Sequence, residues 1–237
     1  MIKVGSIIAV LLVALGGCRY PADVEDSLES VKSGHLHIGA IHNPPWVDCT
    51  EGNGPARGLE AELAEGLAAR LDATIHWSCG PESQIIKALE QNQLQLAIGG
   101  LVHSPRTAEG IALSNPYYTS QKQIGFRSEA DIPAEADTLS VGILRLDPLS
   151  LPLRELGADV RFVDDYQTAN LPLAASDWQL EALGLTPGPW VLASEQHVWA
   201  APPGENGWMM EIQTYLNSHK KGALRARLVE LGREARQ

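Results

Sequence analysis

Basic residues are scarce in this sequence of 237 residues. It has 18 Lys and Arg against 29 Asp and Glu, and its formal net charge at pH 7 is −11. Such a surface repels phosphate backbones, and no basic stripe with interleaved aromatic residues occurs along the chain. The composition therefore argues against nucleic acid as a partner.

Motifs for covalent catalysis, phosphate binding and zinc binding are also lacking. The sequence contains no Gly-x-Ser-x-Gly nucleophile elbow and no phosphate-binding glycine-rich loop. A zinc site needs three or four converging ligands, and neither His-x-x-x-His nor Cys-x-x-Cys is present. We therefore expect no catalytic residue, no metal and no cofactor.

Long hydrophobic runs are lacking except at the N-terminus, where Val4–Leu15 is mostly apolar and follows Lys3. This run is shorter than the roughly 20 residues that span a bilayer, and its basic start and small-residue end are typical of a secretory signal. Leu15-Gly16-Gly17-Cys18 resembles the bacterial lipobox, in which the cysteine is lipidated and becomes the mature N-terminus. We interpret residues 1–17 as a signal peptide and 18–34 as a lipidated N-terminus and tether. The alternative is a plain cleaved signal that leaves Cys18 as a free thiol.

Export has consequences for location and for the remaining cysteines. With Cys18 lipidated, the protein would lie in the periplasm, anchored to a bacterial membrane; without the lipid, it would be free in the periplasm. Only Cys49 and Cys79 then remain. An even pair in an oxidising compartment favours a disulfide, and two buried thiols are the alternative.

Hydrophobic periodicity after residue 34 predicts alternating strands and helices. In Gly58–Leu71 a leucine recurs every four residues, which makes one apolar stripe on a helix. Strands are predicted at 35–41, 73–78 and 94–98, and a second helix from about 80 to 91. This order predicts a parallel sheet with right-handed crossovers, whose carboxyl edge is where ligands bind.

A second, smaller α/β unit is predicted downstream. Its strands are expected at 139–144, 158–163 and 171–175, and its helices at 149–156 and 178–183. Extended segments are expected at 116–126 and 191–201, and terminal helices at 204–220 and 223–236. The polar stretch 127–138 is interpreted as the crossing between two lobes. Lobe 1 would then comprise 35–126 plus 202–237, and lobe 2 would comprise 127–201.

The ordered set of landmarks resembles family 3 of the extracellular solute-binding proteins, which mostly serve amino-acid ABC importers. The landmarks are Pro44-Pro45-Trp46, Gly58-Leu59-Glu60, Leu67 to Ala73, Ile86 to Gln91, Leu94 to Gly100, and Ser114-Asn115-Pro116-Tyr117-Tyr118. The resemblance implies an α/β, two-lobed periplasmic-binding-protein type II (Venus flytrap) fold that closes on a solute by a hinge. The second lobe is shortened between Asp165 and Asp177.

The resemblance also implies solute-contacting residues. Trp46 matches an aromatic residue that caps the solute, and Glu60 matches an acidic position that often contacts it. Gly100 matches a strand end where the backbone approaches the solute. The alternatives are an ordinary half-buried tryptophan, a favourable acid in the first turn of a helix, and a simple turn.

The carboxylate clamp of the family is where this sequence departs from the pattern. Val102 and Thr107 stand where the family has threonine and arginine. Arg106 is one place too early but could swing in as a solute ligand, with a solvated loop arginine as the alternative. In the second lobe Asp147 stands where the family binds a carboxylate, and it is expected mainly to cap a short helix. We therefore expect that a free α-amino acid held in the usual way is not the solute.

Asp177 matches the second-lobe aspartate that meets a solute's amino group, with a plain helix N-cap as the alternative. If Asp147 and Asp177 both face the cleft, a cation or a polyol would suit the site better than an anion.

These expectations combine into a monomeric solute-binding lipoprotein that delivers a small polar solute, amino-acid-like or cationic, to the membrane subunits of an ABC importer. Two other functions stay open at this point. One is a periplasmic enzyme of the cyclohexadienyl dehydratase type on the same fold, with Glu60 or Asp177 as general acid. The other is a ligand-sensing lobe for a membrane partner.

Overall fold

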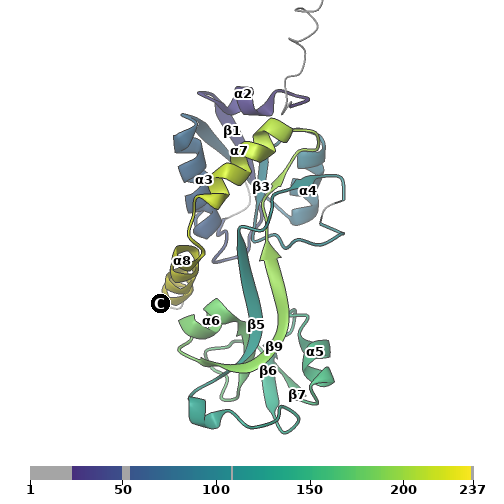
Figure 1. The fold of residues 1–237 in the computed structure, drawn as a ribbon, viewed down its shortest axis with the longest axis vertical. Coiled ribbons are helices and arrows are strands. Elements are labelled where there is room, and N and C mark those ends of the chain that lie inside the picture. Colours follow the sequence, from purple (N-terminus) through teal and green to yellow (C-terminus); the bar gives the residue numbers. More distant parts are fainter. Residues whose placement is uncertain (1–22, 50–53, 108, 236–237) are drawn as a thin grey trace, which may run out of the picture.

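Two α/β lobes are stacked along the long axis of the molecule and joined by two crossing strands (Figure 1). The computed structural model describes residues 23–49, 54–107 and 109–235. Each lobe is built on a five-stranded mixed sheet, ordered β2-β1-β3-β10-β4 in the first lobe and β7-β6-β8-β5-β9 in the second. The predicted pair of α/β units is confirmed.

The first lobe begins with the predicted parallel strands. Its strands are β1 (His35–Ala40), β2 (Thr74–Cys79), β3 (Leu96–Ile98), β4 (Ala112–Leu113) and β10 (Ala200–Ala201), and its helices are α2 (Ser27–Val31), α3 (Leu59–Arg70), α4 (Glu82–Glu90) and α7 (Asn206–Asn217). β1 pairs in parallel with β2 and β3, whereas β10 runs antiparallel to β3 and β4. The short strand β4 was not predicted, since two residues carry no periodicity, whereas β10 lies at the end of the predicted extended segment 191–201.

The second lobe is smaller. Its strands are β5 (Tyr118–Phe126), β6 (Ser140–Leu144), β7 (Asp159–Val163), β8 (Leu173–Ser176) and β9 (Thr186–His197), its helices are α5 (Ser150–Glu155) and α6 (Asp177–Ala182), and a 3₁₀ turn, η1, covers Glu129–Asp131. The chain between β7 and β8, residues 164–172, contains turns and no helix. This is the place where the sequence predicts a shortened lobe.

The predicted position of the crossing between the lobes is wrong. β5 pairs with β9 from Tyr118 to Phe126 and with β8 over Lys122–Gly125, so the second sheet already begins at Tyr118 and not after residue 127. Residues 127–138 follow the far end of β5. The long antiparallel pair β5 and β9 runs between the lobes (Figure 1).

The chain before β1 is also more ordered than the predicted tether. α2 lies on the first lobe, with Val31 fully buried and Ser27 buried. The carboxylate of Glu205 accepts hydrogen bonds from the backbone amides of Glu25 and Ser27, at 2.8 and 3.0 Å. Residues 23–34 therefore belong to the first lobe, whereas residues 1–22, including the predicted signal peptide and Cys18, lie outside the described residues.

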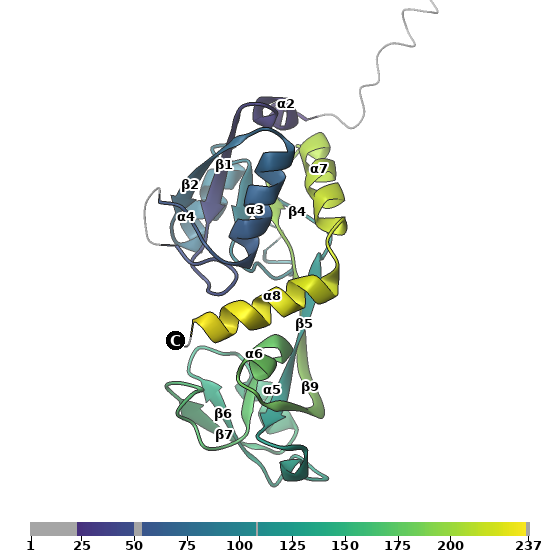
Figure 2. The ribbon, with the colours of Figure 1, turned by 90° about the vertical axis from the view of Figure 1, so that its left-hand side faces the viewer.

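The C-terminal helix α8 (Lys221–Glu234) contacts both lobes, although the sequence placed it in the first alone. It lies across the space between the lobes in Figure 2. Leu224 and Leu228 are buried in the apolar core of the first lobe, and Gly232 packs against Trp178 and Ala182 of α6. The guanidinium of Arg227 pairs with Glu62 of α3 at 2.7 Å.

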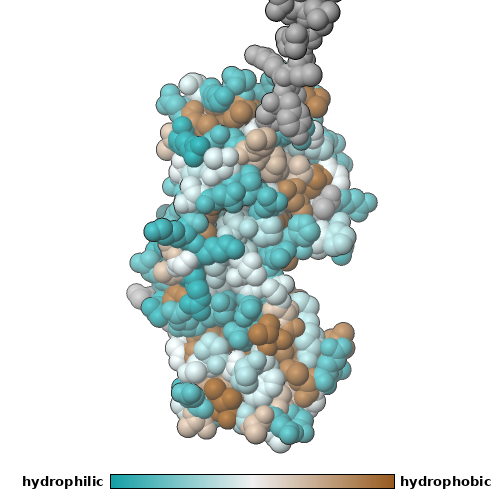
Figure 3. All heavy atoms as spheres, in the orientation of Figure 1, coloured by the Kyte–Doolittle hydropathy of each residue, from teal (hydrophilic) through white to brown (hydrophobic). Residues whose placement is uncertain are grey.

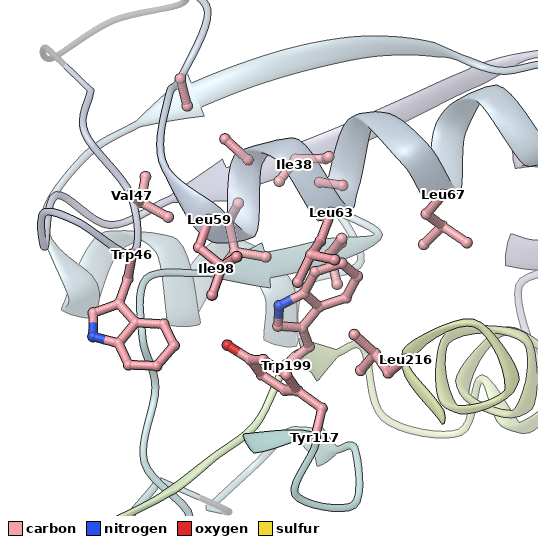
Figure 4. Packing of buried hydrophobic residues seen from close by; sticks show 14 of the residues in the cluster. Ile38, Trp46, Val47, Leu59, Leu63, Leu67, Ile98, Tyr117, Trp199 and Leu216 are labelled. Carbon is pink, nitrogen blue, oxygen red and sulfur yellow. The ribbon is translucent and has the colours of Figure 1, made fainter. Parts of the chain in front are cut away.

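The core of the first lobe forms around the leucine stripe of α3. Leu59, Leu63 and Leu67 are buried, and in Figure 4 the latter two lie over Trp199 and Leu216 of the C-terminal segments. Burial of a leucine side chain contributes about 1.5–3 kcal/mol, so this stripe holds α3 between the sheet and α7. The predicted apolar face is confirmed.

Glu60 follows Leu59 on α3 and is also buried. Unlike the leucines, its carboxylate needs hydrogen-bond donors. Its side chain has no exposure; one carboxylate oxygen accepts from the amides of Gly99 and Gly100, at 2.6 and 2.8 Å, and the other from the hydroxyl of Tyr117. Burial raises the pKa of Glu60, and the three hydrogen bonds oppose that shift. Gly100 has φ +67°, and a Cβ there would lie 2.7 Å from the indole of Trp46. The turn after β3 is therefore held by Glu60 and requires glycine.

The predicted disulfide is confirmed. Cys79 ends β2, Cys49 lies in the loop after β1, and their Cα atoms are 6.2 Å apart. The bond closes a separation of 30 residues and ties the loop that carries Trp46 to the sheet. In the described residues, none of the helices combines the length and the apolar character needed to cross a membrane.

Removal of the disulfide should destabilise the protein by about 3–4 kcal/mol, because the closed loop limits the entropy of the unfolded chain. We expect the double variant Cys49→Ser/Cys79→Ser to unfold at lower urea concentration than the wild type. The wild type should lose a similar amount when reductant is added, while the double variant should not respond. Equal midpoints for both proteins without reductant would contradict this.

Replacement of Glu60 separates the effect of its charge from that of its hydrogen bonds. Glu60→Ala leaves three donors unsatisfied and should cost about 3 kcal/mol or more, whereas Glu60→Gln keeps an acceptor for the two amides and should cost less. Because burial raises the pKa of Glu60 above its ordinary value of 4.5, the folded protein binds this proton more tightly than the unfolded chain.

The Glu60 contribution is therefore largest at low pH and is lost as the pH rises from about 4.5 through the raised pKa. Chemical denaturation of wild type and Glu60→Gln at several pH values should show the stability difference falling over that interval. A difference that grows with pH would mean that the folded state prefers the carboxylate.

Candidate functional site

Four aromatic rings from both lobes meet at the seam between them. This aromatic cluster consists of Trp46 from the first lobe, Trp178 from α6, and Tyr118 and His197 from the crossing strands. The ring of Trp46 stacks on His197 with centroids 4.0 Å apart and meets Trp178 edge-on at 6.2 Å. All four residues are buried. Trp46 thus lies between the lobes as the sequence suggested, but His197 covers one of its faces.

His197 connects the first lobe to the crossing strands. Its ring nitrogens lie 2.9 Å from the hydroxyl of Ser120 and 3.4 Å from the carbonyl oxygen of Gly100. Val102 forms a backbone bridge with the same residue. Burial, helped by the nearby charge of Lys122, lowers the pKa of His197 to about 4. The imidazole is therefore neutral at neutral pH.

Three charged side chains of the second lobe lie beside the crossing strands. This charged cluster consists of Lys122 on β5, Glu195 on β9, and Asp147 in the loop before α5. The ammonium nitrogen of Lys122 is 3.6 Å from Asp147 Oδ2 and 3.7 Å from Glu195 Oε2. The Lys122 and Asp147 side chains are each only 13% exposed. Two carboxylates therefore share one cation in a partly desolvated place.

Asp147 does not cap α5, contrary to expectation. The helix begins at Ser150, and Leu149 is its N-cap residue. The carboxylate of Asp147 instead lies beside Lys122, where the opposite charge stabilises it. Its Oδ1 is buried and has no hydrogen-bond partner among the described residues.

Asp177 is paired with a cation of the protein. It lies in the first turn of α6, where Ser176 is the N-cap residue. Arg225 of α8 pairs with Asp177 at 3.3 Å and also with Glu181, and the amide of Gln121 donates to Asp177 at 3.3 Å. Asp147 and Asp177, the two acidic residues that the sequence assigned to the second-lobe side of the solute site, thus each lie beside a cation of the protein itself.

The structure does not bring Glu60 and Arg106 to this seam as solute ligands. Both carboxylate oxygens of Glu60 accept from protein donors, the amides of Gly99 and Gly100 and the hydroxyl of Tyr117. Arg106 is exposed and lines a different groove, of about 670 Å³, beside Glu82, Lys87 and Glu90 of α4. The loop that carries it lies against α4, because Gly110 approaches Glu90.

Two openings are associated with the space between the lobes. A cavity of about 210 Å³ is lined by Pro44 and Pro45 of the first lobe, by Tyr166, Trp178 and Leu183 of the second, and by Gly232 of α8. In Figure 3 the outline of the molecule also narrows between the lobes on the right-hand side, between α4 and α5. Tyr166 is one of the cavity's lining residues; burial raises the pKa of its hydroxyl, and the nearby carboxylate of Asp147 adds to that shift.

Sequence reasoning missed Lys122, Glu195 and His197. Lys122 is the one basic residue of β5, and Glu195 the one acidic residue of β9. Charges inside strands that are otherwise uncharged were the available signal. Their meeting was not predictable, since Glu195 faces Ser120 only in the register of the folded sheet.

Comparison with known proteins gives matches over most of the chain. Residues 36–230 match the model of the bacterial extracellular solute-binding proteins, family 3. A membrane-bound lytic murein transglycosylase F of Mannheimia succiniciproducens is 28% identical over 149 residues, which are 62% of this chain and 28% of that protein. An arginine-binding periplasmic protein of Mannheimia haemolytica is 26% identical over 55% of this chain and 51% of that protein. The chain thus spans about a quarter to a half of the length of these relatives.

Solved structures share the fold at low sequence identity. An ancestral cationic amino acid solute-binding protein has a TM-score of 0.69 and 19% identity, covering 86% of this chain and 98% of that one. The unliganded, open L-cystine solute receptor of Neisseria gonorrhoeae has a TM-score of 0.68 and 13% identity, covering 89% of this chain and 97% of that one. With its two lobes and crossing strands, the chain belongs to family 3 of the bacterial extracellular solute-binding proteins.

Proposed function

We propose that this protein captures a small amino-acid-like solute between its lobes outside the cytoplasm and delivers it to the membrane subunits of an ABC importer. The observation that carries the proposal is the seam itself. Aromatic and charged groups from both lobes and from the crossing strands converge there, in a chain whose family binds extracellular solutes. Relatives and structural neighbours named for arginine, cationic amino acids and L-cystine support an amino-acid-like solute.

Of the residues suggested by sequence, we place Trp46, Gly100, Val102 and Asp147 around the solute. Gly100 and Val102 contact the neutral His197 from the first-lobe side, and Asp147 lies on the second-lobe side. Asp177 would reach the solute only by exchanging its pairing with Arg225. Hinge motion about the crossing strands would open and close this site.

The geometry favours binding over catalysis. An enzyme of the dehydratase type needs a positioned general acid that can reach its substrate. Glu60 is enclosed by its three protein donors, and Asp177 is held by Arg225. We therefore propose a receptor that catalyses no reaction.

We further propose that the mature protein is anchored by lipid at Cys18. The first described residues, 23–34, lie on the first lobe at the end remote from the second (Figure 2). An anchor attached there would leave the seam between the lobes accessible.

A thermal-shift screen tests the proposed function. A solute at a hundredfold excess over its Kd stabilises the folded state by about 2.7 kcal/mol, which corresponds to a shift of about 5–10 °C in the unfolding midpoint of a domain of this size. We expect at least one L-amino acid or amino-acid derivative to produce such a shift, and its D-enantiomer serves as the control. If amino acids, polyamines, betaines and sugars at millimolar concentration all leave the midpoint unchanged, the receptor function is wrong.

Lipid anchoring is tested in cells that express the full chain. The wild type should incorporate labelled palmitate and sediment with membranes, because acyl chains contribute ~0.8 kcal/mol per buried methylene group. Cys18→Ser should lose the label and appear in the soluble periplasmic fraction, whereas Cys79→Ser should keep the label. Membrane association of Cys18→Ser at the wild-type level would refute the anchor.

A further inference from the structure

The cavity of about 210 Å³ beside α8 is built by three separate parts of the molecule. The loop after β1 contributes Pro44 and Pro45, α6 and its C-terminal end contribute Trp178 and Leu183, and the last turn of α8 contributes Gly232. None of the four residues that we place around the solute is among the described residues that line it. The cavity is therefore separate from the proposed solute site.

The cavity lies where α8 crosses α6 (Figure 2). A Cβ atom at Gly232 would be 3.2 Å from Cβ of Ala182 and 3.4 Å from Cζ3 of Trp178. Glycine weakens a helix relative to alanine, so its presence here is explained by the close approach of the two helices. Gly222, in the first turn of the same helix, has open space around the corresponding position.

Polar atoms on the wall of the cavity are engaged within the protein. The hydroxyl of Tyr166 donates to the carbonyl oxygen of Ala174 at 2.8 Å, and Oε1 of Gln179 accepts from the amide of Ser176 at 3.1 Å. An ordered water needs two to four polar partners, whereas a dry apolar cavity of roughly 150 Å³ is large enough for benzene. The wall therefore suits an apolar ring better than a cluster of waters.

The charge around the cavity is negative. Asp165 is the one charged residue in the described part of its lining, and its Oδ1 accepts from the amide of Gln167 at 2.9 Å. The carboxylate of Asp147 lies near enough to Tyr166 to contribute to the raised pKa of that hydroxyl. An anion in the cavity would be repelled by these carboxylates, and a neutral molecule would not.

We propose that this cavity is a second binding site, which takes a neutral, mainly apolar ring compound somewhat larger than benzene. Such a compound contacts the first-lobe loop, the second-lobe helix α6 and α8 at the same time, so it binds only while these three parts are together. It therefore stabilises the arrangement in which the lobes are closed and α8 is docked on α6. By linkage, it strengthens the binding of any solute that requires the same arrangement.

NMR titration of the mature chain with benzamide and with benzoate tests the ligand class. The two compounds have nearly the same shape, but benzoate is an anion. Benzamide should bind with a Kd of about 0.1–1 mM, an ordinary affinity for a compound of its size. Benzoate should bind at least about tenfold more weakly, because it meets the negative charge around the cavity.

Two exposed positions near the end of α8 provide a matched pair of variants. Ala235 lines the mouth of the cavity, and Arg233 is exposed and is not among its described lining residues. Ala235→Trp should place an indole over the cavity and weaken benzamide by about tenfold or more, the effect of losing most of its apolar contacts. Arg233→Trp adds the same side chain to the same helix and should bind benzamide like the wild type.

A second pair of variants changes the helix crossing itself. Gly232→Ala adds a methyl group in close contact with Ala182 and should weaken benzamide, whereas Gly222→Ala adds it in open space and should not. Hydrogen exchange reports the coupling to α8. At a tenfold excess of benzamide over its Kd, the amides of α8 around Gly232 should exchange up to about tenfold more slowly, and benzoate at the same concentration should have little effect.

The outcomes keep this proposal apart from the receptor function. If benzamide does not bind, or binds Ala235→Trp as tightly as it binds Arg233→Trp, the second site is wrong. Equal affinities for benzoate and benzamide would overturn the neutral ligand class. If a solute found in the thermal-shift screen displaces benzamide, benzamide occupies the solute site, and the second site is wrong while the receptor function stands. Failure of every solute in that screen contradicts the receptor function alone, since the titration with benzamide needs no solute.

Discussion

The buried carboxylate of Glu60 is the constraint on which the inter-lobe face of the first lobe depends. It joins the N-terminus of α3 to the turn after β3 and to Tyr117, directly before the first crossing strand. A carboxylate without exposure is unfavourable unless both oxygens have donors, so these segments must be in place together. The Gly100 turn, the position of Trp46 above it and the entry of β5 are thereby set relative to one another.

Between the lobes, basic side chains pair with acidic ones. The chain has 18 basic residues against 29 acidic ones, yet two of the few cations stand beside acids at the seam. Arg225 is fully engaged, with Asp177 and Glu181 as partners. Lys122 is close to two carboxylates and hydrogen-bonded to neither. The first arrangement holds α8 to the second lobe, and the second joins β5 and β9 to the loop before α5.

α8 gives the two lobes a second connection besides the crossing strands. Its leucines are part of the first-lobe core, its Gly232 lies against α6, and Arg227 returns to α3. Trp178 and Ala182 of the second lobe consequently belong to the same apolar cluster as the first-lobe leucines. Opening of the lobes would have to move this helix relative to one of them.

The sequence alone determined most of the longer helices and strands, the pair of lobes and the disulfide, but not α2 or β4. The leucine stripe of α3, the strand–helix alternation and the even cysteine pair are local or compositional signals that need no knowledge of contacts. Two predictions about contacts were wrong, because Asp147 does not cap α5 and residues 127–138 do not form the crossing between the lobes. Only the tertiary structure decided which charges meet, because Lys122, Asp147 and Glu195 lie on three separate elements and their pairing depends on strand register. The energy of an ion pair depends on a separation of a few ångströms in space, and this separation cannot be read from the spacing of the two residues along the sequence.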